Sequence, residues 1–338
     1  MIILGIETSC DETAVALVED GRKILVNLVA SQVDIHRPFG GVVPELASRE
    51  HLRLLLPLLE ESLTETNLSP SQISAVAFTR GPGLIGALLV GTSFAKALAY
   101  GWRLPLIGVH HLKAHLYAAS LEGEGLDFPL VGLVVSGGHT TIVHLRSWEE
   151  GEILGQTRDD AAGEAFDKVA SLLQLGYPGG PEIEEISSRG DPRKYHLPRG
   201  MLKSGDLDFS FSGIKTAVRY LLDKIPEDER AARAADIAAS FQAAVVEVLL
   251  FKLKQAALLT GARTIVLGGG VTRNRLLREE TQRVFSVPRY RLLIPSPGLC
   301  SDNGAMIAGL AYWRLKAGRT DSWDVDADPN LPWEGGLG

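Results

Sequence analysis

Two histidines, His111 and His115, are spaced so that they could share one metal ion. On a helix, positions i and i+4 lie on one face, and imidazole is a common metal ligand. A zinc peptidase would carry a glutamate directly after the first histidine, as the base that activates water, but Leu112 stands there. A pair of structural histidines explains the spacing equally well until a third ligand is found. Asp302 is a candidate, because it opens an expected helix where its carboxylate could face a cleft.

A second candidate is the small-residue turn Ser136-Gly137-Gly138, between strands expected at 130–135 and 140–145. The amide groups of such a turn can surround a phosphate. The pattern of a serine-hydrolase nucleophile turn is broken at Val134, so Ser136 is not expected to be a nucleophile.

The chain opens on a similar strand, turn and strand, and its turn carries Asp11 and Glu12, which suit cations or hydroxyl groups. This likeness to the turn at 136–138 suggests an internal duplication, although any two hairpins share these features. The run Gly268-Gly269-Gly270 ends another strand and could lie against an adenosine. A tight strand-to-helix turn is the simpler explanation of those three glycines.

Common nucleotide-binding signatures are incomplete. Gly81 to Gly86 has the glycine spacing of a phosphate-binding loop, but Ala87 and Leu88 replace its lysine and hydroxyl residue. The third glycine of a dinucleotide-binding turn is Arg273 here. Any nucleotide site in this chain must therefore be of another kind.

Charged residues give weaker signals. Asp167, on a helix expected at 160–173, could bind a ribose hydroxyl, although exposed charges on helices are usually only solvated. Gly180 follows in a tight turn and could lie against a ligand. Two groups of basic residues could contact a folded RNA or form a solvated surface. They are Arg189, Arg193, Lys194, Arg199 and Lys203, and then Arg263, Arg273, Arg275 and Arg278.

Composition sets the frame for these candidates. With 338 residues the chain suggests two domains, and its net charge of −7 excludes general polyanion binding by the whole molecule. Its 2 cysteines form no framework, and no apolar run has the length of a signal peptide or membrane span. We therefore expect a soluble, cytoplasmic protein that does not enter a membrane.

Alternating strands and helices predict an α/β protein. The acidic, glycine-rich stretch 122–127 marks a boundary between an N-terminal lobe, 1–122, and a C-terminal lobe, 123–338. The second lobe is expected to contain an inserted loop and helical segment at about 177–235, and its last helix to pack back on the first lobe. The polar tail after Lys316 is expected to be poorly ordered or loosely docked.

Taken together, these segments resemble the tRNA threonylcarbamoyladenosine transferase family, bacterial branch, once described as a sialoglycoprotein endopeptidase. The matching segments, in chain order, are Gly5–Thr13, Arg80–Gly83, His110–His115, Val135–Thr140, Gly163–Lys168, Tyr177–Pro181, Phe209–Thr216, Gly268–Val271 with Asn274, and Cys300–Gly304. The resemblance implies a two-lobed actin/Hsp70/sugar-kinase-like (ASKHA) fold with a nucleotide in the cleft between its lobes. It also implies that the duplicated hairpins are real.

The resemblance also assigns residues. It implies that His111, His115 and Asp302 hold one iron(II) or zinc ion per subunit. It further implies an adenine nucleotide, threonylcarbamoyl-AMP or ATP, in the cleft. The implied contacts are Val134, Val135, Ser136, Gly137, Gly138, Asp167, Gly180, Glu184 and Asn274. The family often has aspartate where Glu184 stands, and the longer acid could still reach a ribose hydroxyl.

The implied reaction moves a threonylcarbamoyl group from threonylcarbamoyl-AMP to the exocyclic amine of the adenosine 3′ of the anticodon. The tRNAs concerned read codons that begin with A. The implied partners are tRNA, a paralogous subunit, a small ATPase and an upstream synthase. We add the hypothesis that Asp11 or Glu12 assists proton removal from the amine. The alternatives are a noncatalytic nucleotide-binding scaffold and, disfavoured by Leu112, a metallopeptidase.

Overall fold

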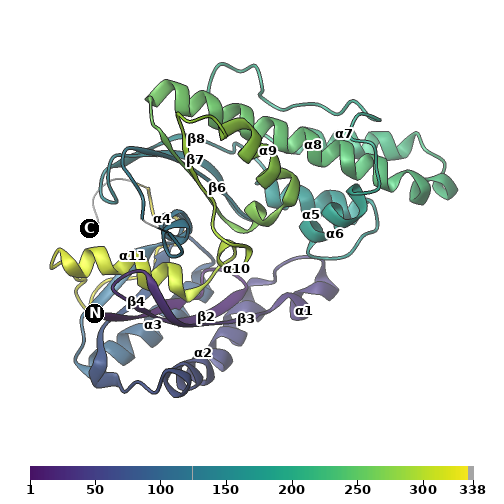
Figure 1. The fold of residues 1–338 in the computed structure, drawn as a ribbon. Coiled ribbons are helices and arrows are strands. Elements are labelled where there is room, and N and C mark those ends of the chain that lie inside the picture. Colours follow the sequence, from purple (N-terminus) through teal and green to yellow (C-terminus); the bar gives the residue numbers. More distant parts are fainter. Residues whose placement is uncertain (124, 334–338) are drawn as a thin grey trace. The chain divides into compact units, whose positions relative to one another are not determined.

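The computed structural model describes residues 1–123 and 125–333, which form two compact units (Figure 1). Unit 1 combines Met1–Gly125 with the segment from Gly298 onward, and unit 2 is the continuous stretch Leu126–Pro297. Each unit is built on a five-stranded sheet. The chain therefore leaves the first unit, builds the second, and returns.

The sheet of unit 1 has the strand order β3-β2-β1-β4-β5. The strands β1, β2 and β3 are antiparallel neighbours, whereas β1, β4 and β5 run parallel. Their bounds are Ile2–Glu7 for β1, Glu12–Glu19 for β2, Lys23–Ser31 for β3, Ile73–Gly81 for β4 and Leu106–His110 for β5. The strands β1 and β2, with the turn between them, are the pair expected at the start of the chain.

Helices cover both faces of this sheet. On one face, Leu4 and Ile6 pack against α2 and α3, while on the other Gly5 meets α11 (Figure 1). This division follows from the alternation of side chains along a strand. A β-carbon at Gly5 would lie 2.3 Å from the carbonyl oxygen of Gly304, so only glycine admits α11 this closely. The helical segments are α1 (Val33–His36), η1 (Arg37–Phe39), α2 (Pro44–Thr66), η2 (Pro70–Gln72), α3 (Ile85–Trp102), α4 (His111–Tyr117), η3 (Ala118–Ser120), α10 (Pro297–Cys300) and α11 (Gly304–Lys316).

The expectation of a loose tail after Lys316 is wrong for the described residues. The Asp321 carboxylate accepts a hydrogen bond from the Gly108 amide at 2.6 Å and pairs with Arg314 at 3.1 Å. The Asp328 amide donates to the carbonyl of Arg80 at 2.9 Å. Since these contacts satisfy buried backbone and charged groups, the tail is part of the packing of unit 1.

The sheet of unit 2 repeats the topology of the first, with strand order β10-β9-β6-β7-β8. Again the first three strands, β6, β7 and β8, are antiparallel neighbours. The strand β9 pairs in parallel with β6, and β10 pairs in parallel with β9. The recurrence is what the duplication hypothesis predicts. The bounds are Leu130–Val135 for β6, Thr140–Leu145 for β7, Gly151–Gln156 for β8, Thr264–Gly268 for β9 and Arg291–Leu293 for β10.

The core of unit 2 is organised around α8, which spans 34 residues as one helix. It is long and apolar enough to cross a membrane, but 72% of its most apolar window is buried, which is typical of a core helix. The helical segments of unit 2 are α5 (Ala162–Leu172), α6 (Gly179–Ser187), α7 (Ser212–Asp223), α8 (Glu227–Thr260), η4 (Gly270–Arg273) and α9 (Arg275–Phe285). The strands β8 and β10 had no counterpart among the expected elements, whereas α6 and α7 lie within the loop and helical segment expected at about 177–235.

Candidate functional site

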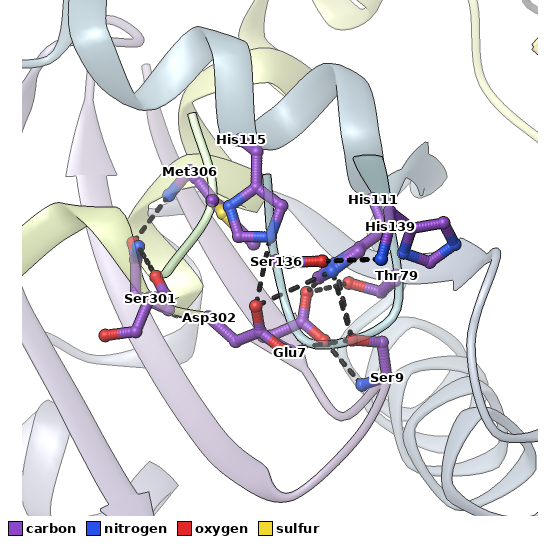
Figure 2. A network of polar contacts seen from close by, with 12 residues as sticks. Glu7, Ser9, Thr79, His111, His115, Ser136, His139, Ser301, Asp302 and Met306 are labelled. Carbon is purple, nitrogen blue, oxygen red and sulfur yellow. Dashed lines mark hydrogen bonds and ion pairs between the residues drawn. The ribbon is translucent and has the colours of Figure 1, made fainter. Parts of the chain in front are cut away.

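The two histidines lie on α4, which begins directly after β5. Both side chains are buried, with 4% and 1% of His111 and His115 exposed. Their Nε2 atoms face the same oxygen, Asp302 Oδ1, at 3.5 Å and 3.1 Å (Figure 2). One potential ligand atom from each of the three residues lies within 4.8 Å of the others. The structure thus brings together the three residues proposed as metal ligands.

The loop that carries Asp302 is fixed by its neighbour Asn303. The Asn303 Oδ1 accepts from the Met306 amide at 3.0 Å, which caps α11, and its Nδ2 donates to the Ser301 carbonyl at 2.8 Å. The helix therefore begins two residues later than the sequence suggested. Asp302 precedes it, and the cap holds the loop from which its carboxylate reaches the histidines.

The state of His115 tests whether these residues suit a metal. The side chain is buried, yet among the described residues Nδ1 has no hydrogen-bond partner and Nε2 has only the ion-pair contact with Asp302. A buried polar atom without a partner is costly, and coordination of an ion would satisfy Nε2. Two imidazoles and one carboxylate form a donor set that suits zinc or iron(II) and leaves open coordination positions. The residues present therefore fit the ion that the family resemblance implies.

A buried carboxylate that the sequence reasoning missed supports the first histidine. Glu7 is fully buried, and its Oε2 lies 3.0 Å from Nδ1 of His111 (Figure 2). The Thr79 hydroxyl donates to the same oxygen at 2.6 Å, and the Ser9 amide donates to Oε1 at 2.5 Å. A signal was present in the sequence, since Glu7 ends a strand that is otherwise wholly apolar or glycine.

Charge in this cluster is strongly coupled. Burial opposes the protonated form of His111, but the carboxylates of Asp302 and Glu7 outweigh it and raise its pKa to about 9. Burial likewise opposes the ionised form of Asp302, yet the positive charges of the two histidines hold its pKa well below the usual range. The site therefore stabilises the ionised carboxylate of Asp302 next to a positively charged His111.

Asp11 and Glu12 lie in the turn after β1 and at the start of β2. Burial, and then the negative charge of Asp302, raise the pKa of Asp11. The loop that carries Asp11 reaches the metal-ligand cluster, since Ser9 Oγ lies 3.4 Å from Asp302 Oδ2. The raised pKa also makes Asp11 a stronger base than an exposed aspartate.

In unit 2, the turn after β6 is held by its own residues. The Ser136 amide donates to the His139 carbonyl at 2.8 Å, and the His139 amide donates to Ser136 Oγ at 3.1 Å. Gly137 and Gly138 are exposed, with open space where side chains would be. The side chains of Val134 and Val135 are buried, so these two residues offer only backbone groups to a ligand.

Two further predicted contacts lie at the start of α6. Asp167 Oδ1 accepts from the Gly179 amide at 2.7 Å and so joins α5 to the beginning of α6. Gly180 follows with nothing within 4 Å of the position of a β-carbon. A glycine in open space at a helix N-terminus leaves room for an anionic or hydroxyl-bearing ligand.

Glu184 and Asn274 meet each other. The carboxylate of Glu184 accepts from the Arg275 amide at 3.1 Å and from Asn274 Nδ2 at 3.4 Å. Asn274 Nδ2 also donates to Gln242 Oε1 at 2.7 Å, and its Oδ1 accepts from the Leu277 amide at 3.0 Å, capping α9. These contacts engage both side chains within unit 2. Gln242, which the sequence reasoning missed, is the buried centre of this clamp.

The first basic group is only partly available to a partner. Arg193 has 93% of its side chain exposed, whereas Arg199 has 22% and pairs with Glu247 at 2.9 Å. In the second group, Arg278 donates to the carbonyls of Thr272 and Pro295, so it supports the start of α9.

Comparisons with known proteins identify the family that the chain matches. Residues 23–309 match the family model of tRNA N6-adenosine threonylcarbamoyltransferase. The proteins of that name from Symbiobacterium thermophilum and Anoxybacillus flavithermus are 52% and 49% identical to this chain. Both alignments cover 98% of this chain, and they cover 96% and 97% of the two relatives.

Solved structures of much lower identity share the fold. Component A of (R)-2-hydroxyglutaryl-CoA dehydratase from Acidaminococcus fermentans is 14% identical, with a TM-score of 0.55 over 94% of this chain and 99% of that one. HypF from T. kodakarensis is 15% identical, with a TM-score of 0.65 over 94% of this chain and 48% of that one. The expected ASKHA fold is confirmed.

Proposed function

The chain belongs to the tRNA N6-adenosine threonylcarbamoyltransferase family, and on this basis we propose how its residues serve the transfer. The protein is a transferase that modifies N6 of an adenosine in tRNA. We take the donor to be threonylcarbamoyl-AMP and the acceptor to be the adenosine 3′ of the anticodon, in tRNAs reading codons that begin with A. A bond forms between the amine nitrogen and the carbamoyl carbon, the bond from that carbon to the phosphate oxygen breaks, and AMP leaves while the amine loses a proton.

His111, His115 and Asp302 would hold one divalent ion, iron(II) or zinc. When bound, such an ion supplies a Lewis acid that polarises a carbonyl or phosphoryl oxygen. The observation that carries this assignment is the convergence of two buried Nε2 atoms on Asp302 Oδ1, with His115 lacking any other partner among the described residues. Glu7 keeps His111 in the orientation that presents Nε2.

The residues of unit 2 would bind and orient the adenylate. The amides of Ser136, Gly137 and Gly138 suit its phosphate, because the turn is exposed and free of side chains at both glycines. Asp167 and Gly180 suit the ribose, and Asn274 with Glu184 would shape the adjoining surface. Holding a reactant in place supplies up to ~7 to 11 kcal/mol in favourable cases.

Asp11 is the better candidate for the group that accepts the amine proton. Its raised pKa, caused by burial and by Asp302, brings it closer to the ideal pKa of a general base at neutral pH. Glu12 is the neighbouring alternative, and at least one of the two is needed for transfer on this proposal.

The proposed partners follow from the reaction. The family acts on tRNA, and we propose that transfer also requires a paralogous subunit, a small ATPase and an upstream synthase that supplies the adenylate. We place all of these steps in the cytoplasm, where tRNA is found.

The direct test is to incubate the purified protein with threonylcarbamoyl-AMP, unmodified tRNA, partner subunits and zinc or iron(II). The tRNA is then digested and its nucleosides are analysed by mass spectrometry. We expect threonylcarbamoyladenosine with the native protein and none with the His115→Ala variant. Absence of the modified nucleoside with the native protein under all these conditions would refute the proposal.

A noncatalytic scaffold is the main alternative. The complete set of three buried ligands argues against it, because a scaffold has no need of a metal-ligand cluster. A scaffold would bind the adenylate without consuming it, so release of AMP in the same assay separates the two functions. A peptidase is disfavoured as well, because Leu112, where a zinc peptidase has its glutamate, is buried and has no acid group.

A further inference from the structure

A buried histidine of α2 takes no part in the proposed chemistry, yet both of its ring nitrogens are engaged. His51 is fully buried, with Nε2 at 3.0 Å from the Cys10 carbonyl oxygen and Nδ1 at 2.8 Å from Thr13 Oγ1. A carbonyl oxygen only accepts, so Nε2 carries the hydrogen and Nδ1 accepts from the threonine hydroxyl. Burial lowers the pKa of His51, which agrees with this neutral form.

A second buried residue, Gln32, holds the next carbonyl of the same turn. Its backbone amide donates to the Asp11 carbonyl at 3.0 Å, and its side-chain nitrogen lies 3.3 Å from Thr13 Oγ1. Its Oε1 faces Nε2 of a further buried histidine, His36, at 3.3 Å. The carbonyls of Cys10 and Asp11 are thus each tied to a buried group on a different segment of unit 1.

The turn held in this way is the one that carries Asp11 and Glu12. Its strand neighbours fix only its ends, because β1 ends at Glu7 and β2 begins at Glu12. Between them, the hydrogen bond from His51 to Cys10 is a side-chain contact that sets the direction of the peptide before Asp11. A different direction there would move the Asp11 side chain, which follows directly from this peptide.

We propose that His51 is a positioning residue, which fixes the turn from Cys10 to Glu12 and with it the Asp11 side chain, in the same loop whose Ser9 Oγ lies 3.4 Å from Asp302 Oδ2. The proposal rests on the proposed role of Asp11 or Glu12 in transfer. The hydrogen-bond contacts of His51 go to Cys10, Thr13 and Gln32, so among the described residues it acts through the backbone of the turn and not through the metal ligands.

Two substitutions separate positioning from packing. In His51→Gln the amide nitrogen can occupy the place of Nε2 and still donate to Cys10. In His51→Asn the shorter amide reaches only the place of Nδ1, so the Cys10 carbonyl loses its partner. Both variants remove the ring, so both lose similar packing. We expect His51→Asn to lower kcat about 10- to 100-fold, with KM for the adenylate and Kd for zinc within about twofold of native values. We expect His51→Gln to stay within about threefold in kcat.

A coupled measurement shows whether the effect passes through Asp11. In an Asp11→Asn background, His51→Asn should cause little further loss of kcat, because residues that act as a unit are not additive. Equal kcat values for His51→Asn and His51→Gln, or a full further loss in the Asp11→Asn background, would overturn the proposal.

Hydrogen exchange provides a readout that does not depend on transfer. We expect the amides of residues 10–13 to exchange faster in His51→Asn than in His51→Gln, with the sheet amides of β1 unchanged. Equal exchange in the two variants would overturn the proposal even if transfer were detected. If the native protein transfers nothing but the exchange difference is present, the proposed function fails while the positioning of the turn stands.

Discussion

The Oε2 atom of Glu7 lies 3.0 Å from Nδ1 of His111, inside a unit where neither side chain is more than 5% exposed. A carboxylate accepts from Nδ1–H, so when the ring is neutral its lone pair is on Nε2. That atom faces Asp302. The contact therefore decides which nitrogen of His111 is available to a metal, and Glu7 acts on the ion through the histidine.

Replacing Glu7 tests this relationship. Glu7→Gln keeps the shape and an acceptor oxygen but removes the charge, so we expect zinc affinity to fall about 10- to 100-fold. Thr79→Val is the matched control, since it removes a hydrogen bond to Glu7 while the carboxylate remains, and its effect should be smaller. Isothermal titration of the metal-free proteins with zinc measures both. Native affinity in Glu7→Gln would contradict the assigned role.

Zinc affinity should also depend on pH. The pKa of His111 is about 9 in the folded, metal-free protein, above the ordinary 6.5, so the ring is protonated at neutral pH. A metal must displace that proton from Nε2, and apparent affinity should therefore rise with pH, by up to tenfold per unit, until pH 9. Competition titrations between pH 6.5 and 9.5 measure this slope. A flat profile across that range is incompatible with a protonated His111.

Two glycines of unit 2 allow a matched test of adenylate binding. A β-carbon at Gly163 would lie 2.6 Å from the Ser136 carbonyl, whereas Gly180 has open space. Gly163→Ala should displace the Ser136 turn and lower both stability and affinity for AMP. Gly180→Ala should leave thermal stability unchanged or slightly raised, since alanine favours helix, yet weaken AMP if the ligand lies there. If Gly180→Ala binds AMP with native affinity, Gly180 is not part of the adenylate site.

The docked tail predicts a large effect on stability. Arg314 and Asp321 are 5% and 6% exposed, and removal of one member of a buried pair typically costs 3–5 kcal/mol. Asp321→Ala should therefore lower the free energy of unfolding of unit 1 by about this amount. The exposed pair Arg49 and Glu45 supplies the control, since Glu45→Ala should change stability by less than about 1 kcal/mol. Urea denaturation compares the two.

The tRNA surface can be probed at the first basic group. Arg193 is almost fully exposed and its nearest acid, Asp191, lies 3.9 Å away, so its charge is available to a phosphate. Reversing Arg193 and Lys194 to glutamate should raise KM for tRNA several-fold without changing AMP affinity. Reversal of Arg283, which pairs with Glu280 at 2.5 Å, is the control. Unchanged tRNA kinetics would direct the search to the second basic group.

Much of the fold was predictable because its signals are local. Most strands of both sheets coincide with runs of apolar residues. The spacing of His111 and His115 places both side chains on one face of any helix that contains them. The strands β8 and β10 were missed because they are only partly buried, so neither shows a continuous apolar run, and β10 has only 3 residues.

The rest of the site depends on contacts between distant segments. Asp302 reaches the histidines only because the chain returns to unit 1, and no spacing in the sequence encodes that return. The docking of Asp321 depends equally on Arg314 and on the buried Gly108 amide of β5. Gln242 and Glu184 look like ordinary helical residues until folding brings them to Asn274. Such pairings are set by tertiary packing, which local propensity does not describe.

The position of α11 also governs the order in which the molecule can form. Unit 2 is one continuous stretch, so a ribosome completes it while the sheet of unit 1 still lacks the helix that covers one face. Domains tend to fold as units during synthesis. We therefore expect the central stretch to fold first and the N-terminal sheet to wait for the segment after Gly298. Because that segment brings Asp302, a complete metal centre can assemble only on a nascent chain in which unit 2 has already been translated.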